Sequence, residues 1–263
     1  MRKSAVVLCA VAAVGAVALL LVPATVPETS RGDTALVSVV VNQGRTVELG
    51  PGETRTFPVE VTASDRSGIR AVDPIGLWGP NYATLKVSPL ACAPLPGTAS
   101  ASRCTGEATA TASAHGLFDD QAGTWFVDLR IRAADGDRYV SKSAGGFSLK
   151  RTALLDSATL TASAPVGTPV QALARLQRAT WEHPGYLPQQ GATAYLQFRP
   201  TGSPTWTTVA TATTDADGRL DVKVPAVRSG AFQWYAPGDK WTAAATSPEL
   251  PLTVDPQPAH AGQ

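Results

Sequence analysis

The sequence predicts an all-β protein built from two tandem sandwich domains, and three observations support this expectation. Turn-forming residues interrupt the chain about every ten residues. The short runs between them alternate apolar and polar side chains, as strands with one buried face do. No long stretch has the periodicity of an amphipathic helix. Short strands separated in this way are typical of β-sandwiches.

The N-terminal segment has the three zones of a secretion signal. Arg2 and Lys3 form a positive start, residues 5–22 are an unbroken apolar run, and Ala24 ends a Val-Pro-Ala sequence suited to signal peptidase. We therefore expect residues 1–24 to be a cleaved signal peptide and the mature protein to be secreted. The alternative is an uncleaved anchor, because the apolar run lies at the lower limit for a membrane span.

The charge of the mature chain is nearly balanced. Of the 22 basic and 21 acidic side chains, two basic ones lie in residues 1–24, which leaves a net charge of −1. Proteins that neutralise phosphates need a basic surface, and the sequence shows no sign of one. We therefore expect neither nucleic acid nor, after signal cleavage, a membrane as partner. The expected partner is an extracellular protein or a cell-wall polysaccharide.

Cysteine usage agrees with an oxidising destination. Signal cleavage leaves one pair, Cys92 and Cys104. An even pair in an exported chain predicts a structural disulfide, and the lack of a C-x-x-C spacing argues against redox catalysis. The bridge would close a short loop and stabilise the fold by about 3 kcal/mol on the loop-entropy model.

The first set of strand patterns is clearest at residues 124–132. One face there is apolar, with Trp125, Val127, Leu129 and Ile131, and the other carries Asp128, Arg130 and Arg132. Residues 54–62 also alternate, but Pro58 cannot donate a hydrogen bond to a neighbouring strand. We therefore expect that strand at a sheet edge. Further strands are expected at residues 36–41, 69–72, 138–143 and 147–150.

A second set of strand patterns begins near Arg151. The turn Asp215-Ala216-Asp217-Gly218 is a hairpin signal, and the Pro- and Gly-rich residues 182–191 are expected to form a long loop. About seven strands in about 100 residues is the size of an immunoglobulin-like sandwich. The expected strands are residues 158–162, 170–176, 194–198, 206–212, 220–224, 232–234 and 250–254.

Specific turn and strand motifs connect the chain to a known family. From Thr193 the sequence reads TAYLQFRPTGSPTWTTVATATTDADGRLDVKV, and from Ser229 it reads SGAFQWYAPGDKWTAAA. These segments resemble the immunoglobulin-like module of secreted actinobacterial proteins. The N-terminal half, with its cysteine pair and its Ala-Asp-Gly-Asp turn, is similar to the β-domain that accompanies that module. The resemblance covers residues 36–254 and implies two tandem immunoglobulin-like sandwiches. It implies little about activity, because such proteins carry at most a generic calcium-binding label.

The expected domain organisation has five segments, and little linker separates the two sandwiches, so we expect them to keep a fixed relation. The segments are a signal peptide at 1–24, a flexible spacer at 25–34, an N-terminal sandwich at 35–151, a C-terminal immunoglobulin-like sandwich at 152–254 and a disordered tail at 255–263.

The sequence contains no complete catalytic constellation. Three histidines, His115, His183 and His260, are too few for the imidazole clusters of copper–zinc sites. Neither H-E-x-x-H nor G-x-S-x-G occurs. We therefore expect no catalytic residues and a non-enzymatic protein. The enzyme alternative is a hydrolase whose site is assembled from scattered residues.

No cofactor is expected, with calcium as the alternative. Asp119-Asp120, Asp135-Gly136-Asp137 and the Asp215–Gly218 turn each place carboxylates together, and Ca²⁺ prefers such oxygen ligands. Asp and Gly are also favoured by hairpin turns alone. Asp135 and Asp137 are retained as the candidate metal ligands.

Six tryptophans leave carbohydrate binding open as well. Trp78, Trp181 and Trp241 lie near loops or strand ends, where an exposed ring could stack on a sugar. The alternative is that each ring caps the end of a sandwich core. The function favoured by these observations is a secreted binding, adhesion or wall-associated scaffold protein. A calcium- or carbohydrate-binding module and a hydrolase with an unrecognised site are the alternatives.

Overall fold

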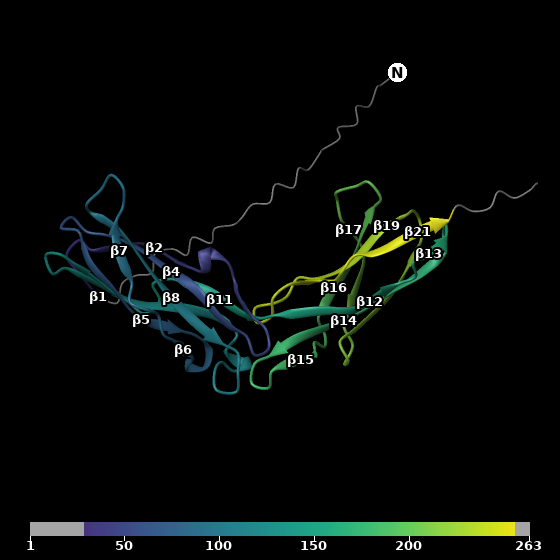
Figure 1. Cartoon of the computed structure of the whole chain (residues 1–263), viewed down its shortest axis with the longest axis horizontal. Coiled ribbons are helices and arrows are strands. Elements are labelled where there is room, and N and C mark those ends of the chain that lie inside the picture. The colour runs from purple at the N-terminus through teal and green to yellow at the C-terminus, as the bar shows by residue number, and fades with distance from the viewer. Residues whose placement is uncertain (1–28, 256–263) are drawn as a thin grey trace, which may run out of the picture.

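A computed structural model describes residues 29–255, so the predicted signal peptide lies outside the described residues. Two β-rich lobes lie end to end along the long axis (Figure 1). The prediction of an all-β protein is confirmed. The helices of the described part are three short 3-10 turns, η1 (Asn42–Gly44), η2 (Pro80–Tyr82) and η3 (Asp119–Gln121). None of them has the length and hydrophobicity that a membrane-crossing helix needs.

The N-terminal lobe is a sandwich of two sheets. One has the order β2-β4-β8-β7. The other has the order β1-β10-β9-β11-β3, and β5 pairs with the free side of β9 and with β6. The strands are β1 (Thr29–Arg31), β2 (Ala35–Val41), β3 (Val47–Leu49), β4 (Thr54–Ser64), β5 (Ile69–Trp78), β6 (Thr84–Leu85), β7 (Ala91–Pro94), β8 (Ala101–Thr111), β9 (Gly123–Ala133), β10 (Arg138–Ser141) and β11 (Gly146–Arg151).

The core of this lobe confirms the alternation predicted for residues 124–132. Trp125, Val127 and Leu129 of β9 are fully buried. They belong to the same apolar cluster as Phe57 and Val59 from β4 in the opposite sheet. Each such side chain stabilises the fold by roughly 1.5–3 kcal/mol when it leaves water.

The C-terminal lobe is also a sandwich. In one sheet β14 pairs with β12 on one side and with β18 and β15 on the other. The second sheet has the order β13-β21-β19-β16-β17, with β20 against β19. The strands are β12 (Ala153–Leu160), β13 (Ser163–Pro165), β14 (Pro169–Thr180), β15 (Gly185–Pro188), β16 (Thr193–Pro200), β17 (Thr207–Thr213), β18 (Arg219–Pro225), β19 (Gly230–Ala236), β20 (Ala245–Thr246) and β21 (Leu250–Asp255).

Both lobes have an immunoglobulin-like topology. In each, the first two long strands pair antiparallel in one sheet, and the last strand pairs with a central strand of the other sheet. A short early strand also crosses over to run parallel to the last strand, as β3 does with β11 and β13 does with β21. The two lobes are therefore two tandem immunoglobulin-like sandwiches.

Several of the described strands were not predicted, among them β8 and β15. β8 pairs with β4 along its whole length, from Thr54 opposite Thr111 to Ser64 opposite Ala101. Its buried side chains, Ser102, Cys104, Ala108 and Ala110, are all small, so they give only a weak apolar signal in the sequence. β15 lies within the predicted loop of residues 182–191, because its backbone continues the ladder of β14.

The position expected for Pro58 is wrong, because β4 lies inside its sheet between β2 and β8. The β2 ladder ends where Val41 faces Val59. Pro58 is the next residue of β4, so this part of the strand has a partner on one side only. The missing N–H group is tolerated there for the same reason as at a sheet edge.

The flexible spacer predicted at residues 25–34 is wrong from residue 29 onward. β1 pairs antiparallel with β10, from Thr29 opposite Val140 to Arg31 opposite Arg138. The Thr34 side chain is buried and donates a hydrogen bond to Asp65. Residues 29–31 therefore add a strand to the sheet that contains β10 and do not form a flexible spacer.

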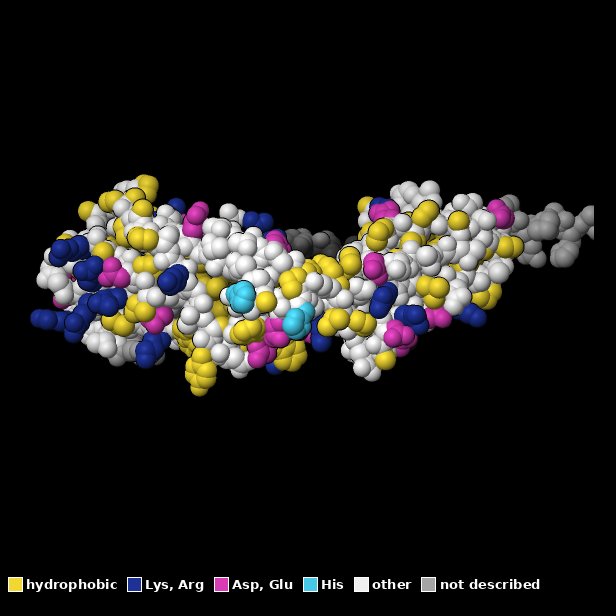
Figure 2. Space-filling view, turned by 60° about the horizontal axis from the view of Figure 1, so that its bottom comes forward, with side chains coloured by type: hydrophobic (Ala, Val, Ile, Leu, Met, Phe, Trp, Pro, Cys, Tyr) yellow, Lys and Arg dark blue, Asp and Glu magenta, His cyan; other side chains and the backbone are white. Residues whose placement is uncertain are grey.

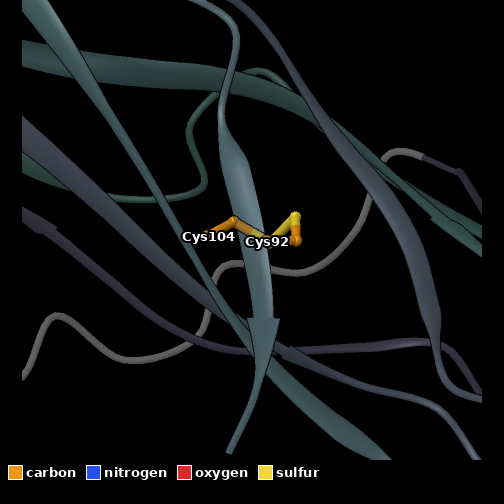
Figure 3. Close-up of a disulfide and its surroundings, with 2 residues drawn as sticks. All are labelled: Cys92 and Cys104. Carbon is orange, nitrogen blue, oxygen red and sulfur yellow. A yellow bond between two sulfur atoms is a disulfide. The ribbon is translucent and has the colours of Figure 1, made fainter.

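The disulfide between Cys92 and Cys104 is present and joins β7 to β8 (Figure 3). The two residues face each other directly in the ladder, and Cys104 is fully buried. Because β7 is an exposed edge strand, the bridge attaches it covalently to the neighbouring strand.

Replacing both cysteines by serine (C92S/C104S) should lower the free energy of unfolding by about 2–3 kcal/mol, because the unfolded chain regains the entropy of the open loop. Urea denaturation monitored by tryptophan fluorescence measures this loss. A reducing agent should destabilise the wild type and leave the double variant unchanged. Equal stability of the two proteins would contradict the prediction.

Candidate functional site

The junction between the two sandwiches is a continuous backbone network. β11 ends at Arg151, and Thr152 alone separates it from β12. The Arg151 N–H donates to the carbonyl of Trp241 at 2.9 Å, and the Ala243 N–H donates to the carbonyl of Arg151 at 2.8 Å. The Thr152 N–H donates to the carbonyl of Leu49 at 3.0 Å. Residues 241–243 of the C-terminal domain thus pair with the end of β11 in the N-terminal domain.

Trp181 anchors the junction from the C-terminal side. It follows β14 in the chain, yet its ring is fully buried in the apolar cluster of the N-terminal sandwich. Its Nε1–H donates to the Leu49 carbonyl at 3.1 Å, and its backbone N–H donates to Asp119 Oδ1 at 2.7 Å. The prediction of Trp181 as a carbohydrate platform is therefore wrong, because a buried ring offers no face to a sugar.

A charged pair closes the junction beside Trp181. Arg151 is 8% exposed and forms an ion pair with Asp119, whose Oδ2 lies 3.1 Å from its guanidinium. Burial lowers the pKa of Arg151, and the charge of Asp119 acts against this shift. Both carboxylate oxygens of Asp119 therefore bind residues of the junction: Oδ1 accepts the Trp181 N–H and Oδ2 pairs with Arg151. Its role is structural.

The variant Trp181→Ala should lower the free energy of unfolding by about 3–5 kcal/mol, because it empties a packed site and removes the Leu49 hydrogen bond. It should also loosen the relation between the domains. Urea denaturation and small-angle X-ray scattering measure the two effects. The control Trp241→Ala, at a ring that is 43% exposed, should cost under about 1 kcal/mol. Equal losses in both variants would contradict the assignment.

A cleft of about 330 Å³ lies beside the junction. Arg151, Arg178, Gln189, Asp239 and Trp241 are among its lining residues. The Lys240 ammonium lies over the Trp241 ring, 4.0 Å from its centre. One face of this predicted carbohydrate platform is therefore already occupied by a cation.

Trp78 is the other remaining predicted platform, and one face of its ring is covered as well. Its ring is stacked on Phe126 with the centres 4.7 Å apart, and its Nε1–H donates to the carbonyl of Lys142. Trp78 is 38% exposed although it belongs to a strand of the sandwich. The hydrogen bond and the stacked partner hold the ring in one orientation on the outer face of the sheet.

The structure brings Asp135 and Asp137, the predicted calcium ligands, together with two further carboxylates. Asp33 and Asp65 complete a group in which one oxygen of each residue lies within 4.8 Å of the others. Gly32 has φ +80° and lies so close to Asp137 that a Cβ would overlap its carboxylate. Sequence reasoning missed Asp33 and Asp65, because they come from the turns after β1 and after β4.

Hydrogen bonds account for much of this acidic cluster. Burial of Asp65 would raise its pKa, but hydrogen bonds from the Thr34 hydroxyl and from the Ser67 hydroxyl and N–H lower it on balance. Arg66 forms an ion pair with Asp33. The Asp137 N–H donates to Asp135 at 3.0 Å, which is ordinary turn geometry.

Calcium binding by Asp135 and Asp137 stays a prediction. The four carboxylates have the ligand chemistry that Ca²⁺ prefers, but Arg66 and several donors already compensate part of their charge. In the other carboxylate cluster, Asp215 Oδ1 accepts the N–H groups of Asp217 and Arg219, which explains that cluster as a hairpin turn. Calorimetric titration with millimolar Ca²⁺ tests the prediction, and the absence of a heat of binding would contradict it.

The lowered pKa of Asp65 makes stability depend on pH. Its charged form is favoured in the folded state, so its contribution is present above the ordinary value of 3.8 and is lost as the pH falls through the lower folded value. Asp65→Asn should therefore destabilise the protein at pH 7 by about 1–3 kcal/mol, and the difference from the wild type should shrink towards pH 2–3. Urea denaturation at both pH values measures this. A difference that is constant with pH would contradict the prediction.

The balanced total charge does not describe the surface, so the expectation of no basic surface is wrong. Arg31, Arg138 and Arg132 face one another directly across β1, β10 and β9. Arg130 follows on the same face of β9, and all four side chains are exposed. Lys and Arg side chains gather over the N-terminal sandwich, at the end away from the junction (Figure 2).

Comparison with known proteins identifies no family. No protein-family model matches the chain, and no curated protein matches it. Among solved structures, the D00-D0 domain of intimin covers 82% of this chain and 100% of its own at 11% identity, with a TM-score of 0.29. The tandem Ig repeats of Dlar cover 81% and 94% at 12% identity, with a TM-score of 0.26. A superoxide reductase from Ignicoccus hospitalis covers 40% and 82% at 11% identity, with a TM-score of 0.27. Likeness of this degree carries no argument about function.

Proposed function

We propose that this chain is an exported, non-enzymatic binding protein that acts as a rigid scaffold outside the cytoplasm, in adhesion or in association with a cell wall. The observation that carries the proposal is the burial of Trp181, from the C-terminal half, in the core of the N-terminal sandwich. A shared core restrains the two domains, because any rotation between them would expose a large apolar ring.

The hydrogen bonds at the junction support the same role. Backbone groups of Arg151 and Thr152 are paired with both domains, so the segment that would otherwise act as a hinge has little freedom. Inter-domain motion is the default when the interface is small and polar, whereas this one combines an apolar anchor with a strand extension. A fixed separation between two ends is a property of a spacer or scaffold.

The residues around the cleft support a non-enzymatic role. Asp239 is the one carboxylate lining it, and its Oδ1 already accepts the N–H groups of Trp241 and Thr242. The lining contains no histidine or cysteine. His115 and His183 are exposed in turns outside it. A nucleophile with an oriented base is therefore not assembled among the residues that line this cleft.

Export is part of the proposal, supported by the signal pattern of residues 1–24 and by the disulfide. Expression of the full chain in an exporting host should release protein that begins at Thr25. N-terminal sequencing of the protein in the medium measures this. Protein that starts at Met1 and remains with the membrane would favour the anchor alternative.

A sedimentation assay tests the binding role. Exported protein is mixed with isolated cell walls of the cells that produce it, and the pellet should retain the intact protein. The wall should release no soluble fragments. Protein that stays in the supernatant would contradict wall association. Time-dependent release of sugars or peptides would instead support the hydrolase alternative.

A further inference from the structure

One outer sheet face of the N-terminal sandwich combines two kinds of exposed group. We call it the arginine–aromatic face; it consists of Trp78, Phe126, Arg130, Arg132, Arg138 and Arg31. We infer that this face binds a linear polysaccharide that carries carboxylate groups. The inference rests on the proposed binding function and names the class of partner.

The arginine row is not explained by stability. Arg31, Arg138 and Arg132 are direct cross-strand neighbours, and like charges in that position destabilise a sheet. Neighbouring strands lie about 4.8 Å apart, so the row places three cations at this repeat. A bound polyanion would attract each of these arginines and so offset the repulsion between them.

Intramolecular pairing neutralises only part of the row. Asp73 binds Arg132 through both oxygens, at 2.9 and 3.0 Å. Within residues 29–255, no hydrogen bond or ion pair engages the side chains of Arg31, Arg130 and Arg138. Their guanidinium groups are therefore available, and the planar fork of a guanidinium fits a carboxylate with two hydrogen bonds.

The aromatic pair occupies the other end of the same face. Trp78 lies opposite Phe126, and Phe126 lies opposite Gly146 on the far side. A Cβ added at Gly146 would lie 3.8 Å from the Phe126 ring, so the glycine leaves that flank uncovered. Phe126 is half-buried and Trp78 stacks on it, so the surface that the two rings together leave exposed can pack against the apolar face of a sugar, which buries aromatic surface.

The two groups are arranged for an extended ligand. Phe126 and Arg130 lie on the same face of β9, four residues apart, which corresponds to about 13 Å along the strand. A ligand that contacts both needs rings and negative charges in one chain. Acidic polysaccharides have both, whereas a neutral glycan would leave the arginine row without a partner.

Charge argues against nucleic acid as the occupant. Nucleic-acid-binding domains are strongly basic overall, because each backbone phosphate carries a charge. Here Asp73 and Asp128 lie on the same sheet face, and residues 25–263 have a net charge of −1. A polymer with sparser charge, met outside the cytoplasm, fits this surface better.

Binding of the full-length exported chain to immobilised polygalacturonate tests the inference, with neutral dextran and single-stranded DNA in parallel. The wild type should bind polygalacturonate, and raising the salt from 50 to 200 mM should weaken binding about tenfold or more, because bound counterions are released. R31S/R138S and, separately, Trp78→Ala should each weaken binding about tenfold. The control R219S/K223S removes two exposed cations from β18 of the C-terminal domain and should bind within about twofold of the wild type.

All substituted side chains are exposed, and thermal unfolding verifies that each variant is folded. Equal binding by R31S/R138S and by its control would overturn the inference, as would equal binding to dextran. Stronger binding to DNA would overturn it in favour of nucleic acid. If wall sedimentation succeeds but polygalacturonate is not bound, this inference fails and the proposed function stands. If the protein does not bind the wall, the proposed function fails, whatever the result with polygalacturonate.

Discussion

The burial of one tryptophan across a domain boundary determines the form of the whole molecule. Trp181 belongs to the C-terminal half by sequence and to the N-terminal core by packing. Around it, Leu49 accepts both the indole N–H and the Thr152 N–H, so a single carbonyl holds the anchor and the connecting residue. The strand extension at Arg151 and the Asp119 ion pair lie beside this anchor, and Asp119 also accepts the Trp181 N–H.

The strand patterns that could be predicted are those with strong hydrophobic contrast. The alternation in β9 marked its buried face correctly, since Val, Leu and Ile alternate there with Asp128, Arg130 and Arg132. β8 also alternates between buried and exposed positions, but its buried side chains are only Ala, Ser and Cys, which are too small to give a clear apolar pattern. Such a strand is specified by its partner β4 instead of by its own pattern.

The sites were harder to predict than the fold, because they depend on register between distant segments. Asp135 and Asp137 could be singled out as neighbours in a turn, whereas Asp33 and Asp65 join them only through folding. The arginine row is likewise invisible in the sequence, where Arg31 and Arg132 lie far apart. The balanced total charge also led to the wrong expectation of no basic surface, since it averages over surface regions of opposite charge. Trp181 could not be distinguished from Trp78, because both lie at the end of a strand and their burial depends on what packs there.

The pairing of β1 with β10 gives the beginning of the described chain a second consequence. Arg31 is the last residue of that three-residue strand, so one side of the cationic row is held by very few hydrogen bonds. A protease that trimmed the chain past this point would remove a guanidinium from the row and open the β10 edge, while leaving both cores intact. Affinity for an acidic polymer would then be set by N-terminal processing, and a purification tag placed at that end would lie beside the surface under test.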